Sequence, residues 1–312
     1  MTPQFVDFNA DGFTDIVTGT FDGSPHISYG SEAGFGEPTH ILDGEGNRML
    51  LSQFWDYNDK SWQGSGGQHC ISAAAFDWDD DGDYDLLLGD YRKGLLYLRM
   101  NNGTNAKPVF DVENIQVMLG DKPFAVAGGM SAPRLVDWDG DGLTDIVTGG
   151  MSRGGVYLYR NTGQLGKPEF APAEPLLARE TTDPQAAKAP STGCYVEAAD
   201  YDGDGDLDLL VGGYANWNSQ RQSLTEEQQQ RVKELQKQQT EVTEKIQQFS
   251  KAMDDQLSKA QTAEARRAVI AEMRANKEYK ELTDKQRAVS QELMKFQGQS
   301  KRAAGVWLYI RK

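Results

Sequence analysis

The stretch Asp137-Trp138-Asp139-Gly140-Asp141-Gly142-Leu143-Thr144-Asp145, followed by Ile146-Val147-Thr148-Gly149-Gly150, decides the fold of this chain. Carboxylates stand at its first, third, fifth and ninth places, and the glycine at the sixth place permits the backbone reversal that turns them inward. Calcium binds six to eight oxygens, and the carbonyl at the seventh place adds a further one. The stretch therefore predicts a calcium-binding loop.

An EF-hand begins with the same pattern and has to be considered first. That motif requires a bidentate Glu at the twelfth place and a helix after the loop. The twelfth residue here is Thr148, and it lies in a β-branched run that ends in two glycines. Such a run predicts a strand, which excludes the EF-hand.

The loop occurs four times, beginning at Asp7, Asp77, Asp137 and Asp200, at intervals of 70, 60 and 63 residues. This regular recurrence marks an internal repeat. We predict up to four bound Ca²⁺ ions, held by the side chains at the first, third, fifth and ninth places and the backbone carbonyl at the seventh. The predicted ligand residues are Asp7, Asn9, Asp11, Phe13 and Asp15 in loop 1; Asp77, Asp79, Asp81, Asp83 and Asp85 in loop 2; Asp137, Asp139, Asp141, Leu143 and Asp145 in loop 3; and Asp200, Asp202, Asp204, Asp206 and Asp208 in loop 4.

Strand patterns recur with the loops. A short apolar segment precedes each loop, as at residues 3–6 and 133–136, and an alternating segment follows at residues 155–161, which we match to residues 94–100. A turn and a fourth segment come next, ending at Phe170 in the third repeat and at Phe110 in the second. Four short strands and one loop in about sixty residues are typical of one blade of a β-propeller.

On these loops and strands the chain resembles the FG-GAP/VCBS repeat proteins, whose propeller blades carry such calcium loops, as those of integrin α-subunits also do. The resemblance covers residues 1–220 and 304–312. The Gly-Ala-Pro of the family name is absent, and residues 131–133 are the nearest match. The resemblance implies a mostly β fold of four blades with calcium sites, and it names no partner. The fourth repeat lacks the outer segment that Phe170 marks, so either four blades close imperfectly or further N-terminal blades complete a larger propeller.

The insertion at residues 221–303 has a different composition, with one glycine and no proline. Thr225 and Gln228 predict a capping box at the start of a helix from residue 225 to 259. Apolar residues recur at Val232, Leu235, Val242, Ile246 and Phe249, which predicts a heptad seam interrupted by a glutamine at position 239.

A second helical stretch follows, and we expect chain breaks near residues 258–262 and 282–284. The pattern predicts an antiparallel coiled-coil hairpin. Residues 304–312 then repeat the strand at residues 155–161, so we expect the hairpin to be inserted between two strands of the fourth blade.

The charge of the chain limits its partners. The formal net charge is −15, with 47 acidic and 32 basic residues, so we expect no nucleic-acid partner. We find no signal peptide and no apolar run of about eighteen residues, and expect no membrane span. Cys70 and Cys194 are expected to be two reduced core thiols. Because weak calcium loops suit compartments rich in calcium, we expect an extracellular, periplasmic or cell-surface location.

The leading hypothesis is a non-catalytic, calcium-binding scaffold for an unidentified protein or carbohydrate ligand. One alternative is an enzyme that acts on a polysaccharide at the propeller axis, for which His69 and Cys70 are the candidate groups. Another is an assembly subunit that self-associates through residues 221–303 or through an open blade edge. The aromatic cluster at residues 54–57 and Trp62 could bind a ligand or fill a gap between blades.

The four loops differ in charge. Loop 1 has Asn9 at the third place, so it offers one carboxylate fewer than the others. Loops 2 and 4 carry a further acid at the seventh place, Asp83 and Asp206, whose side chains we expect to point outward. We therefore expect loop 1 to bind Ca²⁺ most weakly.

Overall fold

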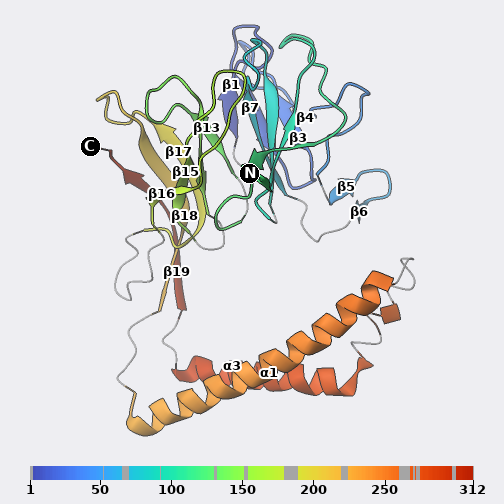
Figure 1. Cartoon of the computed structure of the whole chain (residues 1–312), viewed down its shortest axis with the longest axis vertical. Coiled ribbons are helices and arrows are strands. Elements are labelled where there is room, and N and C mark those ends of the chain that lie inside the picture. The colour runs from blue at the N-terminus through green and yellow to red at the C-terminus, as the bar shows by residue number, and fades with distance from the viewer. Residues whose placement is uncertain are drawn as a thin grey trace. The chain divides into compact units, whose positions relative to one another are not determined.

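A computed structural model of the chain describes residues 3–51, 53–64, 70–91, 93–129, 132–150, 154–178, 189–218, 224–259, 268–269, 271, 275–296 and 300–311 (Figure 1). These residues fall into two compact units. One lies within Met1–Asp183, Ala187–Asn216 and Arg302–Lys312, and the other contains the segment Trp217–Lys301. Each unit is described by itself below.

The first unit is mostly β, and four of its antiparallel sheets correspond to the four repeats (Figure 1). Sheet 1 contains β1 (Gln4–Val6), β2 (Asp15–Gly19), β3 (Pro25–Ser28) and β4 (Thr39–His40). Sheet 2 contains β7 (Ile71–Phe76), β8 (Asp85–Asp90), β9 (Leu96–Arg99) and β10 (Ile115–Gln116). Sheet 3 contains β13 (Arg134–Val136), β14 (Asp145–Gly149), β15 (Val156–Tyr159) and β16 (Glu174–Leu177). Sheet 4 contains β17 (Thr192–Ala199), β18 (Asp208–Asn218) and β19 (Ser300–Tyr309).

Two short hairpins accompany the sheets, β5 (Phe54–Asp56) with β6 (Ser61–Gln63) and β11 (Met118–Leu119) with β12 (Lys122–Pro123). In each sheet the acidic loop joins the first strand to the second, and the ninth-place aspartate begins the second strand. The prediction that the loops lead into strands is thus confirmed. In sheet 4, β19 lies beside β18.

The match between repeats 2 and 3 was wrong by one residue. Gly89 pairs with Leu96 in sheet 2, and Gly149 pairs with Val156 in sheet 3, so Leu96 and Val156 are equivalent. An alignment of Gly94 with Gly155 shifts the strand by one position. A glycine precedes the strand in both repeats, but the strand begins two residues after Gly94 and one residue after Gly155. Inward-facing positions, not the glycines, set the register.

The predicted fourth segments were also misplaced. Phe110 and Phe170 form only isolated bridges, to Asn101 and Asn161, and the outer strands β10 and β16 begin four or five residues later. The amide oxygen of Asn161 accepts hydrogen bonds from two backbone N–H groups of the intervening turn, at 3.0 and 3.1 Å. This closes the turn tightly and directs Phe170 into the core.

Neighbouring sheets pack face to face through three apolar clusters. Leu86 and Leu88 of β8 pack against Val17 and Ile27 of sheet 1, while Leu87 between them packs with Ile146 of sheet 3. In β14 the next residue, Val147, packs instead with sheet 4. β8 and β14 therefore bury both of their faces, as strands of a sheet packed between two others do. Cys70 and Cys194 are free and buried, as expected for core thiols.

The close approach of neighbouring sheets explains the glycine that ends the second strand. A Cβ atom on Gly149 would lie 2.0 Å from the carbonyl oxygen of Cys194, whereas one on Gly212 would lie 3.9 Å from its nearest neighbour. We therefore expect Gly149→Ala to cost about 1–3 kcal/mol of unfolding free energy. Gly212→Ala, the matched control in sheet 4, should be neutral or slightly stabilising. Thermal unfolding of the two variants checks this, and equal melting temperatures would contradict it.

The second unit is an antiparallel pair of helices, α1 (Glu226–Lys259) and α3 (Lys277–Phe296). The capping box is confirmed, because Gln228 N donates to Thr225 Oγ1 and Thr225 N donates to Gln228 Oε1. Leu235 of α1 packs with Val289 and Leu293 of α3, which shows that the predicted seam lies in the interface.

The expected break at residues 282–284 is wrong, since α3 runs through them. The helix begins instead after Asn276, whose Oδ1 accepts the N–H of Tyr279 at 3.0 Å and so caps the first turn. Within the described parts of the chain, neither helix carries an apolar stretch long enough to cross a membrane.

Candidate calcium loops and an adjoining groove

The first-place aspartates shape the loops. Asp7 accepts hydrogen bonds from the backbone N–H groups of the fifth and sixth residues, at 3.0 and 2.9 Å. Asp77 does the same at 3.1 and 3.0 Å. The sixth residue has a positive φ in all four loops, between 87° and 97°, which explains why it is always glycine. The first-place carboxylate therefore closes the turn that faces the proposed ion.

The ninth-place aspartates are buried, with at most 1% of each residue exposed. In every loop one carboxylate oxygen accepts the N–H of the second loop residue, and the other accepts an N–H at the end of the third strand. For Asp85 the two donors are Trp78 N at 2.8 Å and Asn101 N at 2.7 Å. These residues thus tie the loop to its own sheet, a role that the metal pattern did not predict.

The same bonds identify the third strand of sheet 4. Asp208 Oδ1 accepts the N–H of Arg311, which lies 103 residues further along the chain. The equivalent donors in sheets 2 and 3 lie 16 residues after the aspartate. The fourth repeat, although interrupted by the insertion, therefore keeps the hydrogen bond from its third strand to the ninth-place aspartate.

Three of the loops bring carboxylates together. The oxygens of the first, third and ninth residues lie within 4.8 Å of one another in loops 2, 3 and 4. Oxygens that bind one Ca²⁺ at about 2.3–2.6 Å lie at most about 5 Å apart, so the spacing fits. The fifth-place residues are not in these groups; each accepts the N–H of the seventh residue, as Asp81 does at 3.0 Å. Loop 1 is not among the three loops with converging carboxylates. Its third-place residue, Asn9, donates a hydrogen bond from its side-chain amide to Asp11.

The electrostatics of loop 2 also fit a cation. Partial desolvation within the loop, followed by the negative charges of Asp81 and Asp77, raises the pKa of the exposed Asp79. Burial raises the pKa of Asp85 to about 6, against the opposing effect of its two backbone hydrogen bonds. Carboxylates that are costly to ionise together are stabilised by a bound divalent cation. An all-oxygen donor set suits calcium better than a transition metal.

The expectation that the seventh-place acids point outward is wrong for Asp83, which is 8% exposed. Its Oδ1 is buried and has no hydrogen-bond partner among the described residues, and burial raises its pKa. Asp206 is more exposed, with Oδ2 4.0 Å from Arg311 Nε, but its Oδ1 is also buried and has no hydrogen-bond partner among the described residues. A turn next to loop 2 covers Asp83, since Asn105 accepts the N–H of Tyr84 at 2.7 Å. An unpartnered buried carboxylate oxygen is consistent with a cation nearby.

Loop 3 differs because Arg160 forms an ion pair with its third-place residue, Asp139, and also with Glu174. The register places Met100 at the equivalent position of sheet 2. Arg160 therefore occupies one of the three converging carboxylates, for which a bound cation would have to compete.

Replacing that cation should strengthen loop 3. We expect Arg160→Met, which copies the residue of repeat 2, to tighten calcium binding at this loop a few-fold, because a partly exposed ion pair is worth about 1 kcal/mol or less. Calcium titration of Arg160→Met against Arg160→Lys, which keeps the charge, checks this. Unchanged affinity in the methionine variant would show that the pair does not compete.

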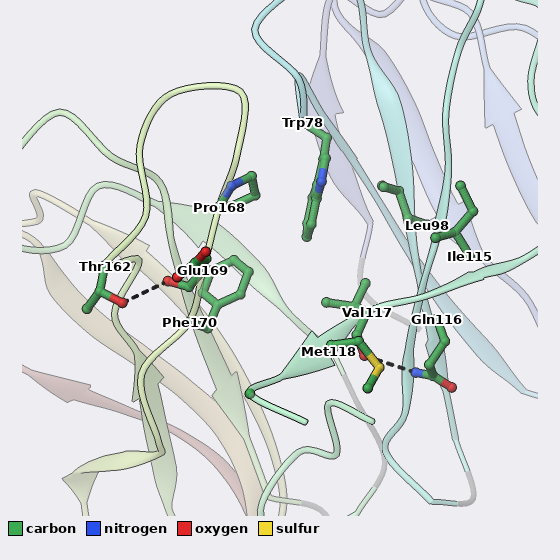
Figure 2. A pocket seen from close by; sticks show the side chains of 11 residues that line it. Trp78, Leu98, Ile115, Gln116, Val117, Met118, Thr162, Pro168, Glu169 and Phe170 are labelled. Atoms are coloured by element: carbon green, nitrogen blue, oxygen red, sulfur yellow. Dashed lines mark hydrogen bonds between the residues drawn. The ribbon is translucent and has the colours of Figure 1, made fainter. Parts of the chain in front are cut away.

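A groove of about 500 Å³ lies beside loop 2 (Figure 2). Trp78, the second residue of the loop, lines the groove. Pro168 and Phe170 lie on one side of its indole ring, and Leu98 and Ile115 lie on the other. The remaining lining residues are Gln116, Val117, Met118, Gly120, Thr162 and Glu169.

A second hollow of about 180 Å³ shares Trp78 and Pro168 with this groove. It is also lined by Asp77 and Asp80 of loop 2 and by Leu143 of loop 3. The groove thus adjoins the candidate metal loops at Trp78, whose backbone N–H donates to Asp85.

Comparison with known proteins matches residues 137–211 to the FG-GAP-like repeat. Among solved structures, an Agrocybe aegerita lectin that recognises non-reducing terminal N-acetylglucosamine is 19% identical, with a TM-score of 0.30 over 67% of this chain and 61% of that one. The chain thus spans less than two thirds of the length of that lectin. No curated protein sequence matches the chain.

Proposed function

We propose that this chain, which carries an FG-GAP-like repeat, is a non-catalytic calcium-binding β-propeller scaffold that binds a carbohydrate or protein ligand outside the cytoplasm. The observation that carries the proposal is the recurrence of one carboxylate arrangement, three times with the same three places converging. A single acidic turn is common on protein surfaces, but the same buried and exposed carboxylates in successive sheets indicate a shared ligand.

The packing of the sheets supports the propeller. Sheets 1 to 4 follow one another in sequence, and each packs its faces against its neighbours. Sheet 4 has an exposed apolar row along β19 and the residue after it, where Val306 is 72%, Leu308 42% and Ile310 38% exposed. Such a row supports a further sheet packing there, from a larger propeller or from a second copy of the chain.

Calcium has two roles in the proposal. In loop 2 it neutralises the carboxylates that surround the loop, and it fixes the backbone of Trp78 through the first- and ninth-place residues. In the other loops it holds the first strand of a sheet against the second. The residues of this chain fix the shape of each loop, and the ion supplies the positive charge that balances the carboxylates.

We place the ligand in the groove beside Trp78. A volume of about 500 Å³ lies in the range of small-molecule sites, and its apolar wall and few polar side chains match the usual lining of such sites. An indole face binds the apolar face of a sugar ring, and the groove is also lined by Glu169 and by Gln116, whose Nε2 donates to Leu96 O and Val117 O and whose Oε1 is the acceptor left for a ligand. These features favour a saccharide, or a short peptide segment, over a flat protein surface.

An oligosaccharide array probed with the full chain tests the proposal, in calcium and in EGTA. We expect binding in calcium, loss of binding in EGTA, and at least tenfold weaker binding for Ile115→Asp and Met118→Asp. Both residues are 45% exposed, so these variants should fold. Met294→Asp, an exposed substitution in the helical unit, serves as the matched control. Binding that survives both groove substitutions would contradict the placement, and binding that persists in EGTA would contradict the role of calcium.

A further inference from the structure

A cluster of nitrogen and oxygen ligands lies at the end of sheet 1 opposite acidic loop 1. Asp22 lies in the turn between β2 and β3, His26 in β3 and His40 in β4. The two histidines are Cα partners in the β3–β4 register, which brings their rings to 4.3 Å between centroids. Their Nε2 atoms approach the same carboxylate oxygen, Asp22 Oδ2, at 3.1 Å for His40 and 3.6 Å for His26.

These separations match those of metal ligands. In a tetrahedral zinc site with bonds of about 2.0–2.1 Å, neighbouring ligand atoms lie about 3.3–3.4 Å apart. One ligand atom from each of the three residues lies within 4.8 Å of the other two. The side chains of Asp22 and His26 are only 10% and 12% exposed, whereas that of His40 is 28% exposed, so the cluster opens to solvent on the His40 side.

A second layer of hydrogen bonds orients the cluster. Asp22 Oδ1 accepts hydrogen bonds from Thr20 Oγ1, from Ser24 N at 3.0 Å and from Ser24 Oγ at 2.7 Å, which leaves Oδ2 directed at the imidazoles. His26 Nδ1 lies 3.4 Å from the carbonyl oxygen of Ser24, so a proton on Nδ1 leaves Nε2 with a free lone pair. A histidine whose second nitrogen donates to a backbone carbonyl is typical of metal sites.

Arg48 and Tyr57 also face the carboxylate. Arg48 NH2 lies 3.2 Å from Asp22 Oδ2, and the Tyr57 hydroxyl donates to the same oxygen at 2.9 Å. Arg48 has further contacts besides the Asp22 carboxylate, because its Nη1 donates to the carbonyl of Trp55, its Nη2 donates to the backbone carbonyl of Asp22, and its guanidinium lies over the rings of Phe54 and Tyr57. Arg48 therefore compensates the negative charge of Asp22, and it has to give up its contact with Oδ2 when a metal binds there, while its contacts with Trp55, Phe54 and Tyr57 keep it nearby.

We propose that Asp22, His26 and His40 bind one zinc ion, or another transition-metal ion that accepts imidazole and carboxylate ligands, with a fourth position open to solvent. Two nitrogens and one oxygen suit such ions, whereas calcium prefers oxygen alone. The site is thus distinct in chemistry from the acidic loops, and it does not depend on the proposed function. The aromatic hairpin of β5 and β6, through Trp55 and Tyr57, forms its outer wall.

Metal titration of the full chain tests the site. Chelator-treated protein is returned to millimolar calcium, which occupies the acidic loops, and is titrated with Co²⁺ and then with Zn²⁺. We expect one equivalent of Co²⁺ with the visible absorption of a tetrahedral ion, displaced by one equivalent of Zn²⁺. We also expect Zn²⁺ to raise the melting temperature in the presence of calcium.

Substitution of the two histidines tests whether they bind the zinc. His40→Ala and His26→Ala should each weaken zinc binding by at least about 100-fold, since loss even of residues behind the ligands costs 10–100-fold. Asp202→Ala in acidic loop 4 is the control and should leave zinc binding unchanged. Partial exposure of His40 allows that variant to fold, which melting in calcium without zinc verifies. Absence of zinc binding to the wild-type chain, or binding that survives both histidine substitutions, would overturn the proposal.

Discussion

Removing calcium should lower the melting temperature of this chain by more than about 10 °C. An occupied site at about 100 times its dissociation constant adds about 2.7 kcal/mol, and 1 kcal/mol shifts the melting temperature of a domain of this size by about 2–4 °C. Three loops with converging carboxylates would each contribute, and their removal also leaves negative charges facing one another. The expected loss therefore exceeds that of any single substitution proposed above.

Calorimetry in calcium and in EGTA measures this effect. Calcium added back alone, without zinc, should restore the original melting temperature, which separates the acidic loops from the Asp22 site. Magnesium at the same concentration is the matched control, because the loops offer more oxygens than its octahedral shell requires and it keeps its water. If the chain melts at the same temperature in calcium and in EGTA, the sheets do not depend on the ion.

Asp85→Ala should destabilise the chain whether or not calcium is present. Its carboxylate accepts the N–H groups of Trp78 and Asn101, and the residue is 1% exposed. Leaving two buried donors without a partner costs about 1–3 kcal/mol each, so we expect a loss of about 2–6 kcal/mol in EGTA. In calcium the loss should be larger, because a ligand of loop 2 is removed as well.

Asp79→Ala is the matched variant in the same loop. Asp79 is exposed and belongs to the same converging group, so its removal should lower the melting temperature in calcium and have little effect in EGTA. Denaturant unfolding of both variants in both buffers gives the comparison. If Asp79→Ala lowers the unfolding free energy equally in calcium and in EGTA, Asp79 does not act by binding the ion. If Asp85→Ala leaves the unfolding free energy in EGTA unchanged, the ninth-place aspartate has no structural role of its own.

The loops and the order of the strands were predictable because the sequence states them four times. Each second strand starts at the ninth-place aspartate, and the capping box at Thr225 forms as its sequence indicates. These are local signals, in which a few neighbouring residues determine the backbone. The exact register of β9 was not predictable in the same way, since it depends on which of Leu95 and Leu96 faces the core.

The features that were missed depend on contacts between distant residues. Asp83 is buried because the turn that contains Asn105 covers it, and a loop pattern carries no information about that cover. Arg160, the residue after β15, reaches Asp139 in loop 3, 21 residues away in the sequence. His26 and His40 come together through the β3–β4 pairing and meet Asp22 in a turn, at a spacing that matches no linear metal motif.

The most direct test of the account is the number of calcium ions that the chain binds. Calorimetric titration of chelator-treated protein should show four ions, three bound more tightly and one more weakly, because loop 1 has Asn9 in place of an aspartate. Asn9→Asp should strengthen the weak site without changing the total, and the combination of Asp137→Ala with Asp200→Ala should reduce the total by two. No detectable calcium binding, or a total that the double variant leaves unchanged, would contradict the account.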